Sequence, residues 1–129
     1  MGKPIARTDG ICFAFPDVCL TPTPTGEVPI PYPNIAQLSD ATGAESVNAG
    51  GKPVIIETDE IASSTGGEPG SSGGVQNGAH LAATTFTSAS GSVKANGEFI
   101  VRQFDTTDQN DGNAVGQVMV GFSTVMVGD

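Results

Sequence analysis

The chain has 129 residues and a formal net charge of −9, with five lysines and arginines against fourteen aspartates and glutamates. This length suffices for one hydrophobic core, and the excess of carboxylates disfavours binding to nucleic acid or to an anionic membrane surface, because both are polyanions. Eighteen glycines and nine prolines disfavour long helices. We therefore expect one all-β domain over residues 1–129, built from short strands, hairpins and Pro/Gly-rich connections.

Prolines dominate the first third of the chain, at positions 16, 22, 24, 29, 31 and 33. Each proline fixes φ and removes a backbone N–H donor, and it favours an extended conformation in the residue before it. These properties predict a short strand over residues 11–15 that ends at Pro16. Residues 16–37 should then form a stiff, extended segment that cannot be a central strand of a sheet.

The middle of the chain combines turn signals with short apolar segments. Gly50 and Gly51 favour a hairpin turn over residues 48–53, across which residues 46–47 can pair with residues 54–56. Thr58, with acidic residues after it, predicts one helical turn over residues 57–64. The Gly/Ser-rich residues 63–80 resemble a linker, but neither flank is large enough to be a domain, so we interpret them as tight turns within the fold.

The last third has the strongest strand signals. Residues 82–88, 91–94 and 99–102 are strand-like, and Asn96-Gly97 is typical of a two-residue hairpin loop. Residues 106–113 predict a polar turn region. Residues 115–127 predict one or two strands with a turn near Gly121, and no internal sequence repeat is visible.

Several motifs occur together in one order: residues 14–22 (Ala-Phe-Pro-Asp-Val-Cys-Leu-Thr-Pro), residues 29–37, residues 64–70, and Gly73-Gly74-Val75. From about residue 5 to residue 127 the chain resembles the PAAR-like proteins that cap the spike of contractile injection systems, such as type VI secretion or related phage-tail-like devices. The resemblance implies a cone-like tip protein that sharpens the spike for membrane puncture and helps attach effector cargo. It also implies one copy per trimer of a VgrG-like spike protein, and no enzymatic activity.

The termini and hydropathy add an expectation about localisation. Residues 1–7 lack the apolar segment of a secretory signal, and no apolar run reaches the 18 residues of a membrane span. We expect synthesis in the cytoplasm, export at the tip of the injection device to the extracellular space or target cell, and no stable membrane insertion. We also expect no fused effector domain, so that any cargo is a separate partner.

The family's metal site, of histidines and one cysteine holding zinc or iron, is implied by the resemblance but poorly matched. The residues of these types here are His80, Cys12 and Cys19, whereas four-coordinate structural zinc needs four ligands. Where relatives carry histidines, this chain has Gln103, Asp108, Gln109 and Asp111. We expect no metal, no cofactor and two free, buried cysteines, with ordinary packing or hydrogen bonds in place of the metal.

Other site chemistry is weak. Residues 105–113 are rich in oxygen ligands but lack the bidentate Glu of a calcium loop, and His80 has no partner motif for catalysis. The candidates for spike docking or for the core are Phe13, Phe15, Ile30 and Tyr32. The alternative function is a small stand-alone secreted effector or binding module.

Overall fold

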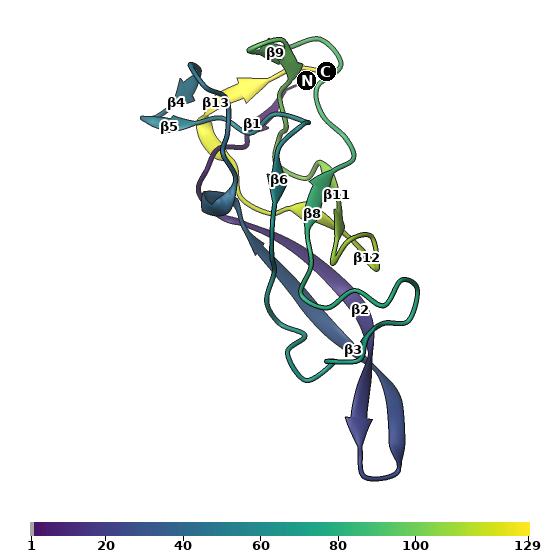
Figure 1. Ribbon diagram of the computed structural model, residues 1–129. Coiled ribbons are helices and arrows are strands. Elements are labelled where there is room, and N and C mark those ends of the chain that lie inside the picture. Colours follow the sequence, from purple (N-terminus) through teal and green to yellow (C-terminus); the bar gives the residue numbers. More distant parts are fainter. Residues whose placement is uncertain (1) are drawn as a thin grey trace.

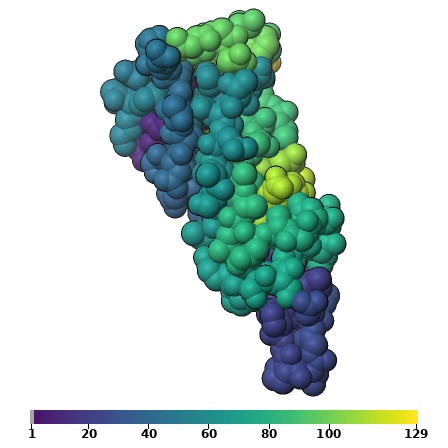
Figure 2. Space-filling model, viewed as in Figure 1, coloured from purple at the N-terminus to yellow at the C-terminus, as the bar shows by residue number. Residues whose placement is uncertain are grey.

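The molecule tapers from a wide end, where both termini lie, to a narrow end formed by one long hairpin (Figures 1 and 2). The computed structural model describes residues 2–129. The hairpin consists of β2 (Ile11–Thr23) and β3 (Gly26–Gln37). The expected cone-like shape is therefore confirmed, although these two strands are long rather than short.

The hairpin belongs to a seven-stranded antiparallel sheet in the order β3-β2-β12-β11-β8-β6, with β7 paired to β2. The remaining strands are β6 (Glu60–Ile61), β7 (Gly73–Gly74), β8 (Thr84–Phe86), β11 (Thr106–Gln109) and β12 (Ala114–Val118). Within residues 2–129, helix is limited to the 3-10 turn Leu38–Asp40. The all-β prediction is confirmed, and no helix of the described residues is long and apolar enough to cross a membrane.

The prediction that the proline-rich segment excludes a central strand is wrong for β2. The strand does not end at Pro16 but continues to Thr23, with Pro16 in the register shift between Ala14 and Asp17. Beyond that shift Cys19 and Leu20 pair with β3 on one side and with β7 on the other. Strand β3 instead carries prolines at 29, 31 and 33, whose ring nitrogens all lie on one side because backbone direction alternates along a strand. Two residues on, the Ile35 N–H donates to the Thr65 carbonyl (2.9 Å), away from β2. The prolines thus remove the donors from the outer edge of the sheet.

Three small two-stranded sheets lie around the wide end, and two of them are hairpins. They are β13 with β1 (Phe122–Val127 and Lys3–Ile5), β4 with β5 (Asn48–Ala49 and Lys52–Pro53), and β9 with β10 (Lys94–Ala95 and Glu98–Phe99). The predicted turns at Gly50-Gly51 and Asn96-Gly97 are confirmed. The φ angles of Asn96 and Gly97 are 51° and 84°, which suit the type I′ turn expected for an Asn-Gly loop.

The chain segments that begin at β1, β5 and β10 are joined in a closed ring of backbone hydrogen bonds. The Ala6 N–H donates to the Val101 carbonyl (3.0 Å), the Val101 N–H to Ile55 (2.9 Å), and the Ile55 N–H to Ala6 (3.0 Å). Three further bonds link the same segments in the opposite sense, each from a residue two positions after the ring to a carbonyl two positions before it: Thr8 donates to Pro53 (2.9 Å), Glu57 to Phe99 (2.9 Å) and Gln103 to Pro4 (2.8 Å). The wide end therefore has approximate internal threefold symmetry, although the sequence shows no repeat.

The ring also divides the core into two apolar clusters. Ile5, Val54 and Ile100 belong to the cluster that includes Val127. The next residue of each segment belongs to a second cluster that includes Cys12, Leu38, Ile61, Phe86 and Val118. Because side chains alternate along extended segments, each of the three segments contributes to both clusters.

Two local predictions are wrong. Residues 57–64 form a turn and strand β6 instead of a helical turn, and the Asp59 carboxylate accepts bonds from the Ile56 N–H (2.9 Å) and the Gly43 N–H (3.1 Å). The first half of the predicted turn region 106–113 is strand β11, because its polar side chains pair with neighbouring strands. The expected strands and turn in residues 115–127 are confirmed as β12 and β13.

We predict that replacing Pro29 and Pro31 with threonine will promote self-association. Both residues are exposed on the outer edge of β3, and threonine would restore N–H donors there, which creates a template for pairing with another chain. Analytical ultracentrifugation at rising concentration measures the effect. Pro24→Thr, in the hairpin turn, serves as the control, and two proteins that sediment alike would contradict this role of the prolines.

Candidate functional site

The wide end exposes the unpaired edge of β13. This strand pairs with β1 alone among the described strands, and it exposes Val125 and Met126 by 36% and 57%. At the same end Arg102 donates from Nη1 to an Asp129 carboxylate oxygen (2.9 Å) and from Nε and Nη2 to Asp105 (3.0 and 2.9 Å). The wide end thus combines an open strand edge with apolar side chains on a fixed frame.

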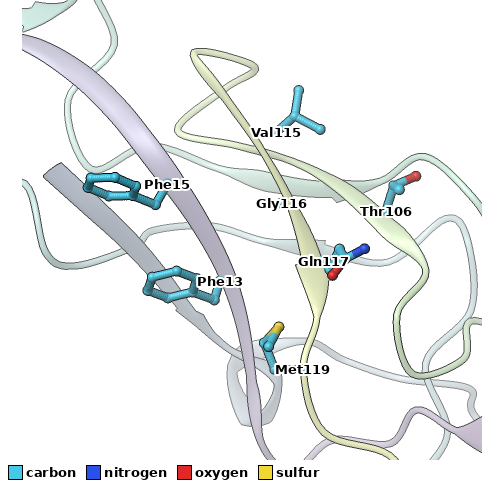
Figure 3. A pocket seen from close by; sticks show the side chains of 7 residues that line it. All are labelled: Phe13, Phe15, Thr106, Val115, Gly116, Gln117 and Met119. Carbon is cyan, nitrogen blue, oxygen red and sulfur yellow. The ribbon is translucent and has the colours of Figure 1, made fainter. Parts of the chain in front are cut away.

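A second apolar surface lies on the flank, where β2, β12 and β11 run side by side (Figure 3). Phe13, Phe15, Val115 and Met119 line an open hollow of about 380 Å³ there, and their exposed fractions are 36%, 57%, 67% and 38%. Their neighbours along the strands, such as Cys12, Ala14, Gly116 and Val118, are buried on the other face. We call this surface the open face.

The sequence-based candidates for docking or core are not brought together. Phe13 and Phe15 are surface residues of the open face, so a core position is wrong for both. Ile30 and Tyr32 are half-buried in β3, and the Tyr32 hydroxyl bonds with that of Thr21 (2.7 Å). The signal for the open face was present in residues 11–15, because a strand that is apolar at successive positions has two apolar faces.

A buried carboxylate joins the hairpin to the loops around it. Asp17 is 1% exposed and has no cationic partner among the described residues. Its oxygens accept bonds from the side-chain amides of Asn113 (2.6 Å), Asn110 (3.1 Å) and Asn34 (3.3 Å). We call Asp17 and these three asparagines the Asp17 cluster.

Two of these asparagines, in the β11–β12 turn, also hold the backbone of the segment between β7 and β8. Asn113 Oδ1 accepts from the Gln76 N–H (3.0 Å), and Asn110 Oδ1 accepts from the Ala82 N–H (2.9 Å). Gly74 packs so closely against Asn113 that a Cβ there would overlap the amide. The cluster therefore ties the glycine-rich loop and the β11–β12 turn to the hairpin. Sequence reasoning missed it because Asn and Asp in turns normally bond their own backbone.

The residues present do not fit the family's metal site. Cys12 and Cys19 lie seven residues apart on β2, on the order of 20 Å at the usual rise per strand residue, so they cannot bind the same ion. His80 is exposed, and the described residues contain no group of three His, Cys, Asp or Glu placed to hold a metal. Cys12, Cys19 and His80 are therefore not placed to coordinate one metal ion together, and the polar side chains of these segments form hydrogen bonds instead.

Both thiols are also held in the protonated form. Burial raises the pKa of Cys12 to about 12. Burial, together with the neighbouring Asp17 carboxylate, raises the pKa of Cys19 to about 11. Because the thiolate is the metal ligand and the nucleophile, neither side chain is prepared for metal binding or catalysis at neutral pH.

Comparison with known proteins now gives the family. The family model described as "Toxin PAAR-like domain" matches residues 10–116. The chain belongs to this family. It is also 36% identical over 116 residues to the protein named DNase toxin Tse7 from Pseudomonas aeruginosa, and the match covers 83% of this chain. The chain spans only about 30% of the length of that relative, and no solved structure matches it.

We predict that the Asp17 cluster, rather than a metal, stabilises the junction of hairpin and loops. Asp17→Ala leaves three buried amides short of an acceptor, and we expect a loss of about 2–5 kcal/mol in the free energy of unfolding. Dialysis against EDTA should leave the melting temperature of the unmodified protein unchanged. Urea unfolding and elemental analysis for zinc and iron provide the two measurements.

Glu27→Ala is the matched control, because it removes an exposed carboxylate from the same hairpin and should change stability by less than about 0.5 kcal/mol. One zinc or iron ion per chain, with a lower melting temperature after EDTA, would refute the role assigned to the cluster.

Proposed function

We propose that this chain is a tip protein that caps the trimeric spike of a type VI secretion system or related contractile device, with its wide end on the spike. The observation that carries the proposal is the approximate threefold symmetry of the hydrogen-bond ring and of the three bonds that flank it. One chain that caps a symmetric trimer has to meet three identical subunit surfaces. Three similar two-stranded sheets around a common axis supply three similar contacts.

The chemistry of the wide end supports this orientation. A spike made of β-strands ends in exposed strand edges, which are prone to unwanted pairing unless they are covered. The free edge of β13 is suited to extend such strands, and Val125 and Met126 beside it supply apolar contact area. The proposed stoichiometry is one tip per trimer.

The narrow end is suited to lead the device into a target membrane. Its hairpin is stiffened by the prolines and contains neither lysine nor arginine between residues 11 and 37. Stiffness matters because a tip under axial load must not bend. Proline fixes φ and so limits the backbone conformations that the hairpin can adopt under that load. This proposed role is mechanical and needs no catalytic group.

We predict that Met126→Asp will abolish binding to the spike. The substitution places a charge on an exposed apolar position of β13, which is costly in an interface core. Native mass spectrometry of the chain mixed with its trimeric spike protein should show one copy per trimer for the unmodified chain and no complex for the variant. Val28→Asp is the control: it places the same charge on an exposed apolar position at the narrow end, so the variant should remain folded and bind the spike normally.

The opposite pattern, in which Val28→Asp prevents binding and Met126→Asp does not, would show that the narrow end docks. If the unmodified chain forms no complex at micromolar concentration, the tip proposal fails.

The alternative is an effector, and the name of the relative favours it. That protein is called a DNase toxin, but this chain matches only about a third of it. We propose that the present residues serve delivery and that DNA cleavage belongs to other parts of such toxins. A plasmid-nicking assay with Mg²⁺ should therefore show no cleavage by this chain, whereas DNA degradation that survives further purification would support an effector.

A further inference from the structure

We propose that the open face of the sheet docks a cationic effector protein that travels with the tip. This inference rests on the proposed function, since it requires a tip that carries cargo. The open face is defined by Phe13, Phe15, Val115 and Met119 around their common hollow (Figure 3). The proposal follows from the position, the rigidity and the charge of this surface.

The open face breaks the threefold symmetry of the molecule. Register pairing places Val115, Asp108, Thr85 and Glu60 in one row across β12, β11, β8 and β6, and directly paired residues point to the same face. The row is apolar at β12 and polar from β11 onward. A symmetric trimer cannot use a surface that occurs once, so the open face is suited to one asymmetric partner per tip.

The open face is also preorganised. Phe13 pairs with both β3 and β12, so the backbone beneath it is fixed on two sides, and Phe15 follows two residues later at the register shift of β2. Rigid aromatic anchors lose little conformational entropy on binding, and such residues contribute much of the energy of protein interfaces. The exposed fraction of 57% for Phe15 and 67% for Val115 leaves most of this apolar area in water.

The charge around the open face determines the chemistry of the partner. Asp108 and Glu60 make no ion pair with any described residue. The strands β2, β3, β6, β8, β11 and β12 contain no lysine or arginine, because the five cations of the chain are at positions 3, 7, 52, 94 and 102. The complementary surface therefore carries an apolar patch beside Lys or Arg.

A second copy of this chain does not meet that requirement. Each copy has a formal net charge of −9, and face-to-face pairing would bring the same carboxylates together. Proteins that act on nucleic acid do meet it, because they bind phosphates through clustered lysine and arginine. A nuclease effector is thus the partner class that fits the surface.

The test uses the portion of DNase toxin Tse7 outside the region matched by this chain, as a purified probe in biolayer interferometry. We expect saturable binding to the unmodified chain that weakens as salt rises from 50 to 300 mM. Val115→Asp should weaken it by about 30-fold or more, as for a central interface residue. Asp108→Asn should weaken it by about three- to tenfold and reduce the salt dependence.

Val28→Asp is the matched control, since Val28 is 42% exposed on β3 but does not line the hollow. It should bind the probe like the unmodified chain. Circular dichroism melts should show that all variants are folded, because each substitution lies on the surface.

The outcomes separate this inference from the proposed function. Absence of probe binding by a chain that still binds the spike overturns the inference and leaves the tip function intact. Equal probe binding by the Val115→Asp and Val28→Asp variants also overturns it. If Val115→Asp abolishes spike binding while Met126→Asp does not, the open face is the spike-docking surface and the cargo inference is wrong.

Discussion

The closed ring of backbone hydrogen bonds between Ala6, Ile55 and Val101 is the constraint on which the wide end depends. It brings together three segments that are far apart in sequence and fixes their side chains alternately in the two core clusters. Each segment continues from a strand of a small two-stranded sheet, and such sheets are marginal when isolated. The ring therefore gives three weak elements a common frame and a common axis.

The narrow half depends on a different interaction. The hairpin of β2 and β3 extends beyond the main core, and the Asp17 cluster fastens it to the glycine-rich loop and the β11–β12 turn. A buried charge without a cation is tolerated only where hydrogen bonds replace its hydration, and three amides do so here. We propose that this cluster holds the junction by hydrogen bonds alone.

Composition and local signals were enough to predict the all-β class, the extended proline-rich segment and the Asn96-Gly97 turn, because these follow from backbone preferences of single residues. The resemblance to the family was confirmed. The central position of β2 was missed because a bulge accommodates Pro16 at one place while the rest of the strand pairs normally. The threefold ring was missed because it consists of main-chain hydrogen bonds in the segments Ile5-Ala6, Val54-Ile55 and Ile100-Val101. Many combinations of β-branched and small residues can form such bonds, so the sequence carries no specific signal for them. The Asp17 cluster likewise depends on contacts between residues up to 96 positions apart.

The central claim is that one chain caps a trimer by matching its own threefold wide end to the axis of the spike. Cryo-electron microscopy of the tip bound to the spike, reconstructed without imposed symmetry, tests it most directly. Our account predicts that the three small two-stranded sheets contact one subunit each, with the ring axis on the spike axis and the β2–β3 hairpin pointing away. A complex in which the narrow hairpin is buried in the spike, or in which the ring axis is tilted well away from the spike axis, would contradict it.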